Sequence, residues 1–369
     1  MKEKIVIIGA NDFQNRLILK AKEMGYETHV FAWQSGDIGE KTADFFYPIS
    51  ITEKEQILEE CKKIKPKGIC SIASDLAVVT VNYVAENLGL TGNGTNTTLG
   101  CTNKYEMRKK MKDAGVRVPG FVKVKENDEE PNLEEMRFPM IVKPTDRSGS
   151  RGITKIFKKE ELKNAIQVSA KQSFDKEAII EEYIEGNEYS CECISYKGTH
   201  YFLAFTKKFT TGSPNFIETG HVQPSDIPEE YQEKIIQEIF KALDALEIKN
   251  GASHTEFKLD KEGNCRIIEI GARMGGDCIG SDLVQISTGY DFVKMVIDVA
   301  CGKKPELEKK NEGQAVEIRF LFNEKDLQEL EEYKQKYPKK IYRISQIEIE
   351  NLGKTVDSST RIGYYIFLK

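Results

Sequence analysis

The sequence predicts an α/β protein in which a parallel sheet is followed by antiparallel sheets. Three observations support this prediction. Apolar strand-like runs alternate with helical patterns through about the first hundred residues, the order that produces a parallel sheet with helices on its faces. Between about residues 178 and 209, strand-like runs instead follow one another directly, as antiparallel strands do. A length of 369 residues is enough for roughly two or three domains with substantial cores.

Composition and charge are those of an ordinary soluble protein. Hydrophobic residues make up 39% of the chain, charged residues 31%, and the formal net charge is −5, which disfavours nucleic-acid binding through general basicity. No apolar run approaches the roughly 18 residues of a membrane helix, and MKEKIVIIGAND lacks the pattern of a secretory signal. The eight cysteines include no CxxC, and with four histidines in the chain a zinc site is disfavoured. We expect a cytoplasmic protein with reduced thiols and with neither nucleic acid nor membrane among its partners.

The first region should form the parallel sheet. Its expected strands are KIVIIG, ETHVFAW, DFFYPIS and GICSIAS, and its expected helices cover residues 14–24, 53–64 and 78–90. Ligands of such sheets bind at the carboxyl ends of the strands, which here lie near Asn11 and Asp75. Because GANDFQ does not match GxGxxG, a dinucleotide site is disfavoured.

The pattern of predicted elements changes near Thr102, where a second region begins. A helix is expected over NKYEMRKKMKDAG, which Gly115 ends. The strands and helices expected after it are VRVPGFVKV, FPMIVKP, AIIEEYIEG, EYSCECISYKG and KGTHYFLAFTKKF, with helices over residues 159–171, 228–248 and 281–301. The tail after about Pro305 is mixed, with an alternating strand in GQAVEIRFLF and a hairpin over QIEIENLGKTV.

Two acids should face each other in a hairpin over residues 254–270. HTEFKL and CRIIEI alternate like strands on either side of DKEGN, and we place the centre of a tight turn between Glu262 and Gly263. Glu256 then lies opposite Glu269, at a Cβ separation of roughly 5 Å where like charges repel. A bulge or register slip can separate the acids, one of them can be a protonated acid, or a divalent cation such as Mg²⁺ can lie between them. The last explanation predicts phosphate-binding residues elsewhere in the chain.

A loop of small residues and two lysines can bind phosphate. The segment DRSGSRGI can close its backbone N–H groups around phosphate oxygens, with charge added by Arg147 or Arg151. Lys143 precedes this loop at the end of an apolar strand, and Lys104 starts the preceding helix. Taken alone, a Gly/Ser loop is more often an ordinary turn, and each lysine is more often a surface charge than a ligand.

The segment EEYIEGNEYS can hold a purine nucleoside. An edge strand with an acid, free backbone groups and an apolar side chain suits the edge of a purine, and Gly186 would turn the chain so that Glu188 meets a ribose hydroxyl. A charged edge strand and turn is the alternative for this segment alone.

These segments occur in one fixed order along the chain. They are Lys104, FPMIVKP with Lys143, the Gly/Ser loop, EEYIEGNE, and the acids of HTEF and IIEIGAR. The arrangement resembles the ATP-grasp superfamily, and within it the carboxylate–amine (L-amino-acid) ligases, with biotin-carboxylase-like and carbamoyl-phosphate-synthase-like relatives. The resemblance covers nearly the whole chain. It implies a Rossmann-like pre-grasp domain over residues 1–100, an ATP-grasp domain over 101–303, and a small mixed α+β C-terminal region over 304–369.

The resemblance also implies the ligands of ATP and of a metal ion. Lys104 and Lys143 would contact the nucleotide phosphates, with Lys143 also near the adenine. Glu256 and Glu269 would hold Mg²⁺, or Mn²⁺ in its place. The remaining nucleotide contacts would come from Ser148, Gly149 and Ser150 over the β and γ phosphates, Glu181 at the adenine amino group, the backbone of Glu182 and Ile184 at the ring edge, and Glu188 at the ribose.

One position departs from the family pattern. Members commonly carry an asparagine two residues after the second acid, as a further metal ligand. That position here is Gly271, which has no side chain to coordinate. A water, a phosphate oxygen or bidentate binding by Glu269 would have to complete the metal shell, so the number of metal ions is left open.

The implied reaction is ATP-dependent activation of a carboxylate. The γ-phosphate passes to a carboxylate oxygen, and an amine attacks the resulting acylphosphate to form an amide or peptide bond, with release of ADP and phosphate; positioning and charge stabilisation dominate such transfers. We expect Arg273 to hold the carboxylate and the transferred phosphoryl group through its forked donors. Backbone N–H groups of Gly275 and Gly276 would approach the same oxygens. A structural ion pair is the alternative role for Arg273.

Two histidines are candidates for the same end of the site. His221, in FIETGHVQPSD, follows a loop that can lie over the site and would help to hold the acylphosphate. A polar loop histidine is the alternative. His254 shares the strand face of Glu256 and is the second choice.

Two other function classes use the same nucleotide site. A bicarbonate-activating carboxylase of the biotin-carboxylase or purine-synthesis type is disfavoured because the chain has no lysine-biotin segment and a short C-terminal region. A non-catalytic nucleotide-binding module would be favoured by loss of the metal acids or of Arg273, and both are present. The expected partners are a small carboxylic acid and an amine, amino acids among them, and a homodimer is left open.

Overall fold

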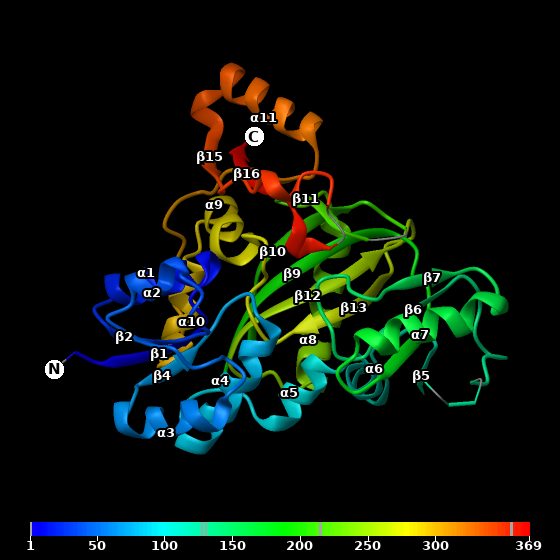
Figure 1. Cartoon of the computed structure of the whole chain (residues 1–369), viewed down its shortest axis with the longest axis horizontal. Coiled ribbons are helices and arrows are strands. Elements are labelled where there is room, and N and C mark those ends of the chain that lie inside the picture. Colours follow the sequence, from blue (N-terminus) through cyan, green and yellow to red (C-terminus); the bar gives the residue numbers. More distant parts are fainter. Residues whose placement is uncertain (1, 127, 130, 214–215, 355–356) are drawn as a thin grey trace.

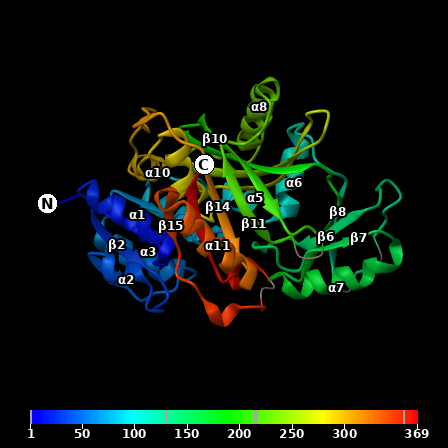
Figure 2. The ribbon, with the colours of Figure 1, turned by 90° about the horizontal axis from the view of Figure 1, so that it is seen from above.

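A computed structural model of the protein describes residues 2–126, 128–129, 131–213, 216–354 and 357–369. Within these ranges the strands pair into three sheets, of four, eight and four strands. Figures 1 and 2 show the parallel N-terminal sheet and the small antiparallel sheet at opposite ends of the molecule, with the large sheet between them. No described helix is both long enough and apolar enough to cross a membrane.

The N-terminal sheet is parallel, as predicted. Its strands β1 (Lys4–Ile8), β2 (Glu27–Phe31), β3 (Phe45–Tyr47) and β4 (Gly68–Cys70) lie in the order β3-β2-β1-β4. The helices of this part are α1 (Asp12–Glu23), α2 (Ile38–Thr42), α3 (Lys54–Ile64) and α4 (Asp75–Leu88). The helix expected over residues 78–90 starts three residues earlier because the Ser74 hydroxyl caps it, accepting from the Ala77 N–H at 3.2 Å. Asp75 is therefore the first helical residue beyond strand β4.

The small sheet carries part of the predicted nucleotide site. It comprises β5 (Phe121–Lys125), β6 (Met140–Pro144), β7 (Thr154–Ile156) and β8 (Glu177–Glu182) in the order β5-β8-β6-β7, covered by α7 (Leu162–Gln172). Before it come α5 (Thr95–Thr102), which was not predicted, and α6 (Lys104–Asp113). The Asn103 side chain caps α6 by accepting from the N–H groups of Tyr105 and Glu106 at 3.0 and 3.2 Å. This cap makes Lys104 the first residue of the helix.

The large sheet joins the middle of the chain to its last described segment. Its order is β13-β12-β9-β10-β11-β14-β16-β15, with strands β9 (Asn187–Tyr196), β10 (Thr199–Thr210), β11 (Glu218–Gln223), β12 (Gly251–Leu259), β13 (Cys265–Gly271), β14 (Val316–Leu321), β15 (Ile341–Ile344) and β16 (Gly363–Leu368). The helices associated with it are α8 (Glu229–Ala245), α9 (Val284–Thr288), α10 (Phe292–Ala300) and α11 (Glu324–Lys336). Because β14 pairs with β11, one sheet spans the predicted boundary at residue 303. The three-part division of the chain stays a prediction.

Two sequence expectations are wrong. The single helix over residues 281–301 is broken into a π-helical turn over Ile279–Leu283, α9 and α10. The break falls at Gly289, whose φ of +79° ends α9 and whose Cβ position would lie 2.2 Å from the Asn311 carbonyl oxygen. The hairpin over QIEIENLGKTV is absent from its described part, where Ile349–Asn351 forms a 3₁₀ turn, while residues 355–356 lie outside the described ranges.

A β-bulge shapes the hairpin of β12 and β13. Glu256 pairs directly with Glu269, as predicted, but the next pair towards the turn is Phe257 with Ile267. Ile268 is therefore an extra residue, and the connection over residues 260–264 is longer than the tight turn expected. Of the three explanations for the acid pair, the bulge is present but does not separate the acids.

One apolar core joins the N-terminal part to the large sheet. It contains buried residues from β1 and α1 together with residues of β9, β12 and α10, among them Ile7, Leu17, Ile194, Ala252 and Val296. A second core packs α8 and α6 against β9, β12 and β13. The first core also contains Cys70, at the end of β4, and Met274, just after β13, so packed side chains hold these two strand ends close to each other.

Asp291 adds a charged tie at the start of α10. Its carboxylate caps the helix by accepting from the Lys294 N–H at 3.1 Å and lies 3.0 Å from Lys20 Nζ and 2.7 Å from Lys310 Nζ. Burial alone would raise the pKa of Asp291, but these partners outweigh it and hold the pKa below its ordinary value.

Asp291→Asn should keep the cap and remove only the charge. Stabilisation from a lowered carboxyl pKa is present above the unfolded value, roughly 3.9, and is lost as pH falls through the lower folded value. We expect the variant to lower the free energy of unfolding by about 1–2 kcal/mol at pH 7, and by much less near pH 3. Urea unfolding at the two pH values measures this, and an equal difference at both would contradict the charge argument.

Candidate active site

One cavity of about 340 Å³ lies between the small sheet, the large sheet and the N-terminal part. Gly275 does not line it, but fourteen of the residues predicted for the site do: Lys104, Lys143, Ser148, Gly149, Ser150, Glu181, Glu182, Ile184, Glu188, His221, Glu256, Glu269, Arg273 and Gly276. Gly271 and Arg147 also line it, whereas Arg151 points to Asp357, with Nε 3.4 Å from Oδ2.

A buried charge cluster closes the cavity at the small sheet. The Lys143 ammonium lies 2.5 Å from Glu181 Oε2, and Arg108 Nε contacts the other carboxylate oxygen. Burial alone would raise the pKa of Glu181, but Arg108 and Lys143 outweigh burial and hold it below its ordinary value. Burial lowers the pKa of the Lys143 ammonium despite this partner. The cluster holds one carboxylate between two cations at the cavity wall.

Two hydrogen bonds anchor the Gly/Ser loop at the cavity. Gly149 and Ser150 have φ values of +75° and +60°, so two successive residues adopt the left-handed conformation. Ser150 Oγ donates to the Phe216 carbonyl at 3.0 Å, and Lys104 Nζ donates to the Arg147 carbonyl at 2.7 Å. A turn of this kind can form an anion-binding nest, in which successive backbone N–H groups converge on one ligand.

The opposed acids are each paired with a lysine. Glu269 Oε1 lies 2.9 Å from Lys104 Nζ, and Glu256 Oε1 lies 2.5 Å from Lys208 Nζ and 3.3 Å from His254 Nε2. Each of these contacts uses Oε1, so Oε2 is the oxygen through which either acid would take a cation. Within the described residues no three His, Cys, Asp or Glu side chains form a metal centre.

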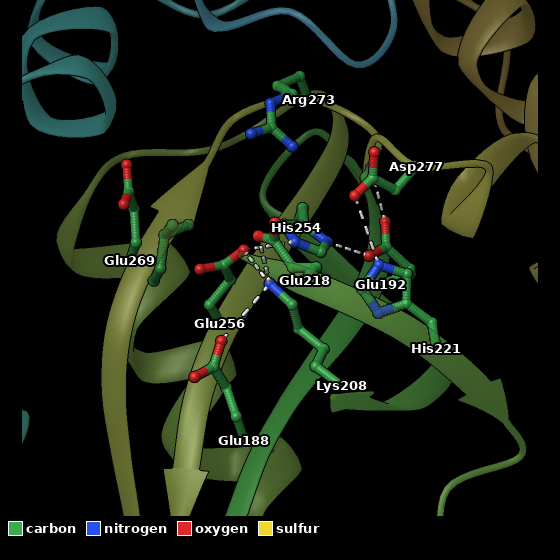
Figure 3. A network of polar contacts seen from close by, with 12 residues as sticks. Glu188, Glu192, Lys208, Glu218, His221, His254, Glu256, Glu269, Arg273 and Asp277 are labelled. Carbon is green, nitrogen blue, oxygen red and sulfur yellow. Dashed lines mark hydrogen bonds and ion pairs between the residues drawn. The ribbon is translucent and has the colours of Figure 1, made fainter. Parts of the chain in front are cut away.

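Lys208 stands at the centre of three carboxylates. Figure 3 shows its side chain reaching between Glu188, Glu218 and Glu256, and its ammonium lies 3.7 Å from Glu188 and 3.8 Å from Glu218. Burial would lower the pKa of Lys208, but the carboxylates outweigh burial and raise it. Burial raises the pKa of Glu188, against the effect of Lys208. Lys208 thus keeps its charge and partly neutralises an acidic wall.

Arg273 is held by an acid from the N-terminal part. Its Nε and Nη2 donate to the two carboxylate oxygens of Asp75 at 2.7 and 3.1 Å. Gly276 lines the cavity nearby. The N–H of Gly275, however, donates to Glu192 Oε2 at 2.9 Å, so the expectation that it faces a substrate oxygen is wrong.

His221 lies on a strand rather than in a loop. It belongs to β11, is fully buried, and has Nε2 3.5 Å from Asp277 Oδ2. Burial lowers the pKa of its imidazole. Arg361 holds the same Asp277 carboxylate at 2.9 and 3.0 Å and Glu218 at 2.8 Å, so a residue just before β16 reaches the site.

His254 has a buried acid behind it. Its Nδ1 contacts Glu192, which is fully buried, while Nε2 faces Glu256. The three carboxyl and imidazole groups form a chain that ends at the cavity (Figure 3). Burial would lower the pKa of His254, but Glu192 and Glu256 outweigh it and raise the pKa to about 9.

Comparison with known proteins relates part of the chain to a known domain family. Residues 136–282 match the model of the ATP-grasp domain. The chain contains an ATP-grasp domain. The matched range includes Lys143, the Gly/Ser loop, both opposed acids and Arg273, while Lys104 precedes it.

Relatives of the ATP-grasp domain include ligases. Alanine–anticapsin ligase of Bacillus subtilis strain 168 is 29% identical over 306 residues, which cover 73% of this chain and 64% of that protein. The match thus spans just under two thirds of that relative's length. An L-amino acid ligase structure from Bacillus licheniformis aligns over the whole chain and 93% of its own, with a TM-score of 0.82 and 22% identity. The structure of phosphoribosylglycinamide synthetase from Anaerococcus prevotii aligns over the whole of this chain and 94% of its own, with a TM-score of 0.79 and 24% identity. At these identities the structures show the fold.

Sequence reasoning missed three cations around the ATP-grasp cavity. Arg108 follows Lys104 by four residues and so shares its helix face, a signal that was available. Lys208 follows Lys207 on a strand, where one of two adjacent side chains must face inward. Arg361 had no signal, because a contact with Asp277 across 84 residues appears only in the fold.

Proposed function

We propose that this protein is an ATP-dependent carboxylate–amine ligase that forms an amide or peptide bond through an acylphosphate. The observation that carries the proposal is the meeting of three groups in one cavity. These are the Lys143–Glu181 cluster, the opposed acids Glu256 and Glu269, and Arg273. The relative named as alanine–anticapsin ligase supports the same class of reaction.

The small-sheet end of the cavity suits a purine nucleoside. Glu181 would accept from the adenine amino group and Lys143 would donate towards the ring and the phosphates. Arg108 Nη1 is buried and makes no hydrogen bond within the described residues, so the wall keeps a donor that a purine nitrogen can satisfy. Ile268, which lines the cavity, would give the ring an apolar contact.

The donor set also fits a magnesium ion. Glu256 and Glu269 are hard oxygen ligands on neighbouring strands, and Mg²⁺ usually takes one or two carboxylates together with phosphate oxygens. Mn²⁺ has the same ligand preferences. When bound, the ion would neutralise charge on the transferring phosphate. We leave the number of ions open, since Gly271 adds no side chain to the shell.

The residues at the other end would position the acid. In the first step a carboxylate oxygen of the acid bonds to the γ-phosphorus and the bond to the ADP oxygen breaks. Arg273 and the N–H of Gly276 would hold the acid and the transferred phosphoryl group. In the second step the amine nitrogen bonds to the acyl carbon, the carbon–oxygen bond to phosphate breaks, and the amine loses a proton. His221 and Lys208 would stabilise the phosphoryl oxygens from the large sheet.

A phosphate-release screen tests the proposal. Pairs of amino acids are supplied with ATP and Mg²⁺, products are identified by mass spectrometry, and bicarbonate is included as a separate acid. An amide-linked product with equimolar phosphate is expected. Phosphate release with bicarbonate alone would favour a carboxylase, and ATP binding without any product would favour a nucleotide-binding module.

Lys143→Ala is expected to weaken ATP binding by about tenfold or more, since it removes a charge-assisted contact. The fold should survive because Arg108 still neutralises Glu181. Isothermal calorimetry measures the affinity, with Lys123→Ala as control: Lys123 lies on β5 of the same sheet and pairs with Glu177 outside the cavity. Equal affinities of both variants and the parent would remove Lys143 from the nucleotide site.

The setting of the reaction is also a proposal. The eight cysteines are free and buried, which supports a cytoplasmic location, where thiols stay reduced. We propose small-molecule acid and amine partners and neither nucleic acid nor membrane. Size-exclusion chromatography with light scattering would test the homodimer.

A further inference from the structure

We infer that Asp75, from the N-terminal part of the chain, positions Arg273 for its role in the site, and that Gly271 leaves the room this pair needs. The inference rests on the proposed function, because it assigns a positioning residue for the same reaction. It goes beyond the ATP-grasp domain itself, since Asp75 lies outside residues 136–282.

The geometry of the pair fixes the guanidinium plane. Both carboxylate oxygens of Asp75 accept from Arg273, through Nε at 2.7 Å and Nη2 at 3.1 Å, and Nη1 donates to the Met274 carbonyl at 3.3 Å. The side chains are 17% and 21% exposed, so the pair is well shielded from water. An arginine has five N–H donors. Three are used here, and two remain for a substrate oxygen. A bidentate pair fixes the direction in which those two point.

Asp75 projects from a rigid element. It opens α4 directly after the Ser74 cap, and a helix start is a favourable place for its negative charge. A second link runs beside the ion pair, because the Ala73 N–H donates to the Met274 carbonyl at 3.2 Å. The segments before α4 and after β13 are thus joined by both a backbone hydrogen bond and the ion pair.

The Asp75–Arg273 pair explains why position 271 carries glycine instead of the asparagine of the family pattern. A Cβ at this position would lie 3.1 Å from Arg273 Nε and 3.2 Å from Asp75 Oδ1, which is tighter than ordinary contact. A larger side chain such as asparagine would need space that the ion pair occupies. In the family pattern this position carries a metal ligand. In this chain its side-chain space is filled by the Asp75–Arg273 pair instead.

A double-variant cycle separates positioning from a general tie between parts of the chain. Phosphate release is measured with L-alanine as the acid and a mixture of L-amino-acid amides as amines, since the amides have no free carboxylate to be activated. We expect Asp75→Asn to lower kcat/KM for L-alanine by about 10- to 100-fold, the scale for misplacing a catalytic group, with ATP affinity unchanged within a few-fold. Asp75→Glu should recover part of the loss. Asp75→Asn combined with Arg273→Ala should be no worse than Arg273→Ala alone, since both remove one function.

The matched control is Arg16→Gln. Arg16 joins α1 to Asp282 at 2.9 Å, so it also links the N-terminal part to the segment after β13, but it does not line the cavity. Its activity should stay close to the parent's. If Asp75→Asn reduced activity further in the Arg273→Ala background, Asp75 would act independently of Arg273. If Asp75→Asn and Arg16→Gln both lost activity and thermal stability to the same extent, the Asp75–Arg273 ion pair would be only a structural link between parts of the chain.

A second measurement needs no substrate. With ¹⁵N-arginine labelling, the Nε–H resonance of Arg273, assigned by its absence in Arg273→Lys, should exchange slowly with water. It should become fast-exchanging in Asp75→Asn and in Gly271→Asn. A resonance unaffected by both changes would overturn the inference while leaving the proposed ligase activity standing. Conversely, absence of any product from the parent protein would fail the proposed function, and the resonance would still report on the pair.

Discussion

Glu269→Gln and Glu256→Gln should each reduce ATP-dependent phosphate release to background while the protein stays folded. Glutamine keeps the shape of glutamate but loses the charge that a hard cation requires, and phosphoryl transfer depends on that ion to neutralise developing charge. Both side chains are partly exposed to the cavity, at 27% and 25%. In the Glu256 variant, Lys208 keeps Glu188 and Glu218 as partners, so its buried charge stays compensated. Lys104 would keep its hydrogen bond to the Arg147 carbonyl in the Glu269 variant.

The measurement is phosphate release at saturating Mg²⁺, together with thermal unfolding to show that each variant is folded. Glu262→Gln is the matched control, because Glu262 is an exposed acid in the connection of the same hairpin. Turnover at the parent's rate in either acid variant would exclude that acid as a metal ligand.

Arg273→Ala should separate nucleotide binding from chemistry. If Arg273 holds the carboxylate and the developing acylphosphate, its contribution is largest in the transition state. We expect nucleotide affinity to stay within a few-fold of the parent and kcat/KM for the acid to fall by roughly a hundredfold or more, the scale for losing a charge-stabilising donor. Arg273→Lys should rescue only partly, because a lysine cannot offer parallel donors both to Asp75 and to a carboxylate.

Calorimetry with ATP and steady-state kinetics with the acid test this prediction. Joint loss of ATP binding and turnover would assign Arg273 to the nucleotide site or the core. Unchanged kinetics would mean that the acid binds elsewhere, and that the ion pair with Asp75 is the whole role of this arginine.

The elements that sequence predicted well were those with strong local patterns. The parallel pairing of β1 with β2 and β4 followed from alternating strand and helix signals. The pairing of Glu256 with Glu269 followed from the turn centre placed between Glu262 and Gly263, although the bulge shifts that centre for the pairs nearer to the turn. The failures were nonlocal. The helix expected over residues 281–301 breaks at Gly289, where the Asn311 carbonyl leaves no room for a Cβ. No local pattern contains that contact.

The candidate site divides in the same way. Motif order brought most of the predicted residues to the cavity, Gly275 and Arg151 excepted, because motifs record residue types at fixed spacing. It did not show what those residues contact. Lys208 inside an acidic cluster, Asp75 against Arg273 and Arg361 against Asp277 join segments far apart in the chain. Such pairs are set by sheet order and packing, so they are visible only in the fold.

In a regular strand, the residues that line the cavity and the register of the metal-binding acid candidate would depend on the same unbroken pairing. The bulge at Ile268 separates these two requirements. In an unbroken ladder, neighbouring side chains face opposite sides, yet here Ile268 and Glu269 both line the cavity. The Ile268 carbonyl accepts a hydrogen bond from Arg108 Nη2 at 2.5 Å, so the bulge leaves this backbone acceptor paired. Glu269 is tied by backbone pairing to β12, whereas Ile268 is not. A substitution at position 268 can therefore change the cavity wall while the acid beside it stays in register.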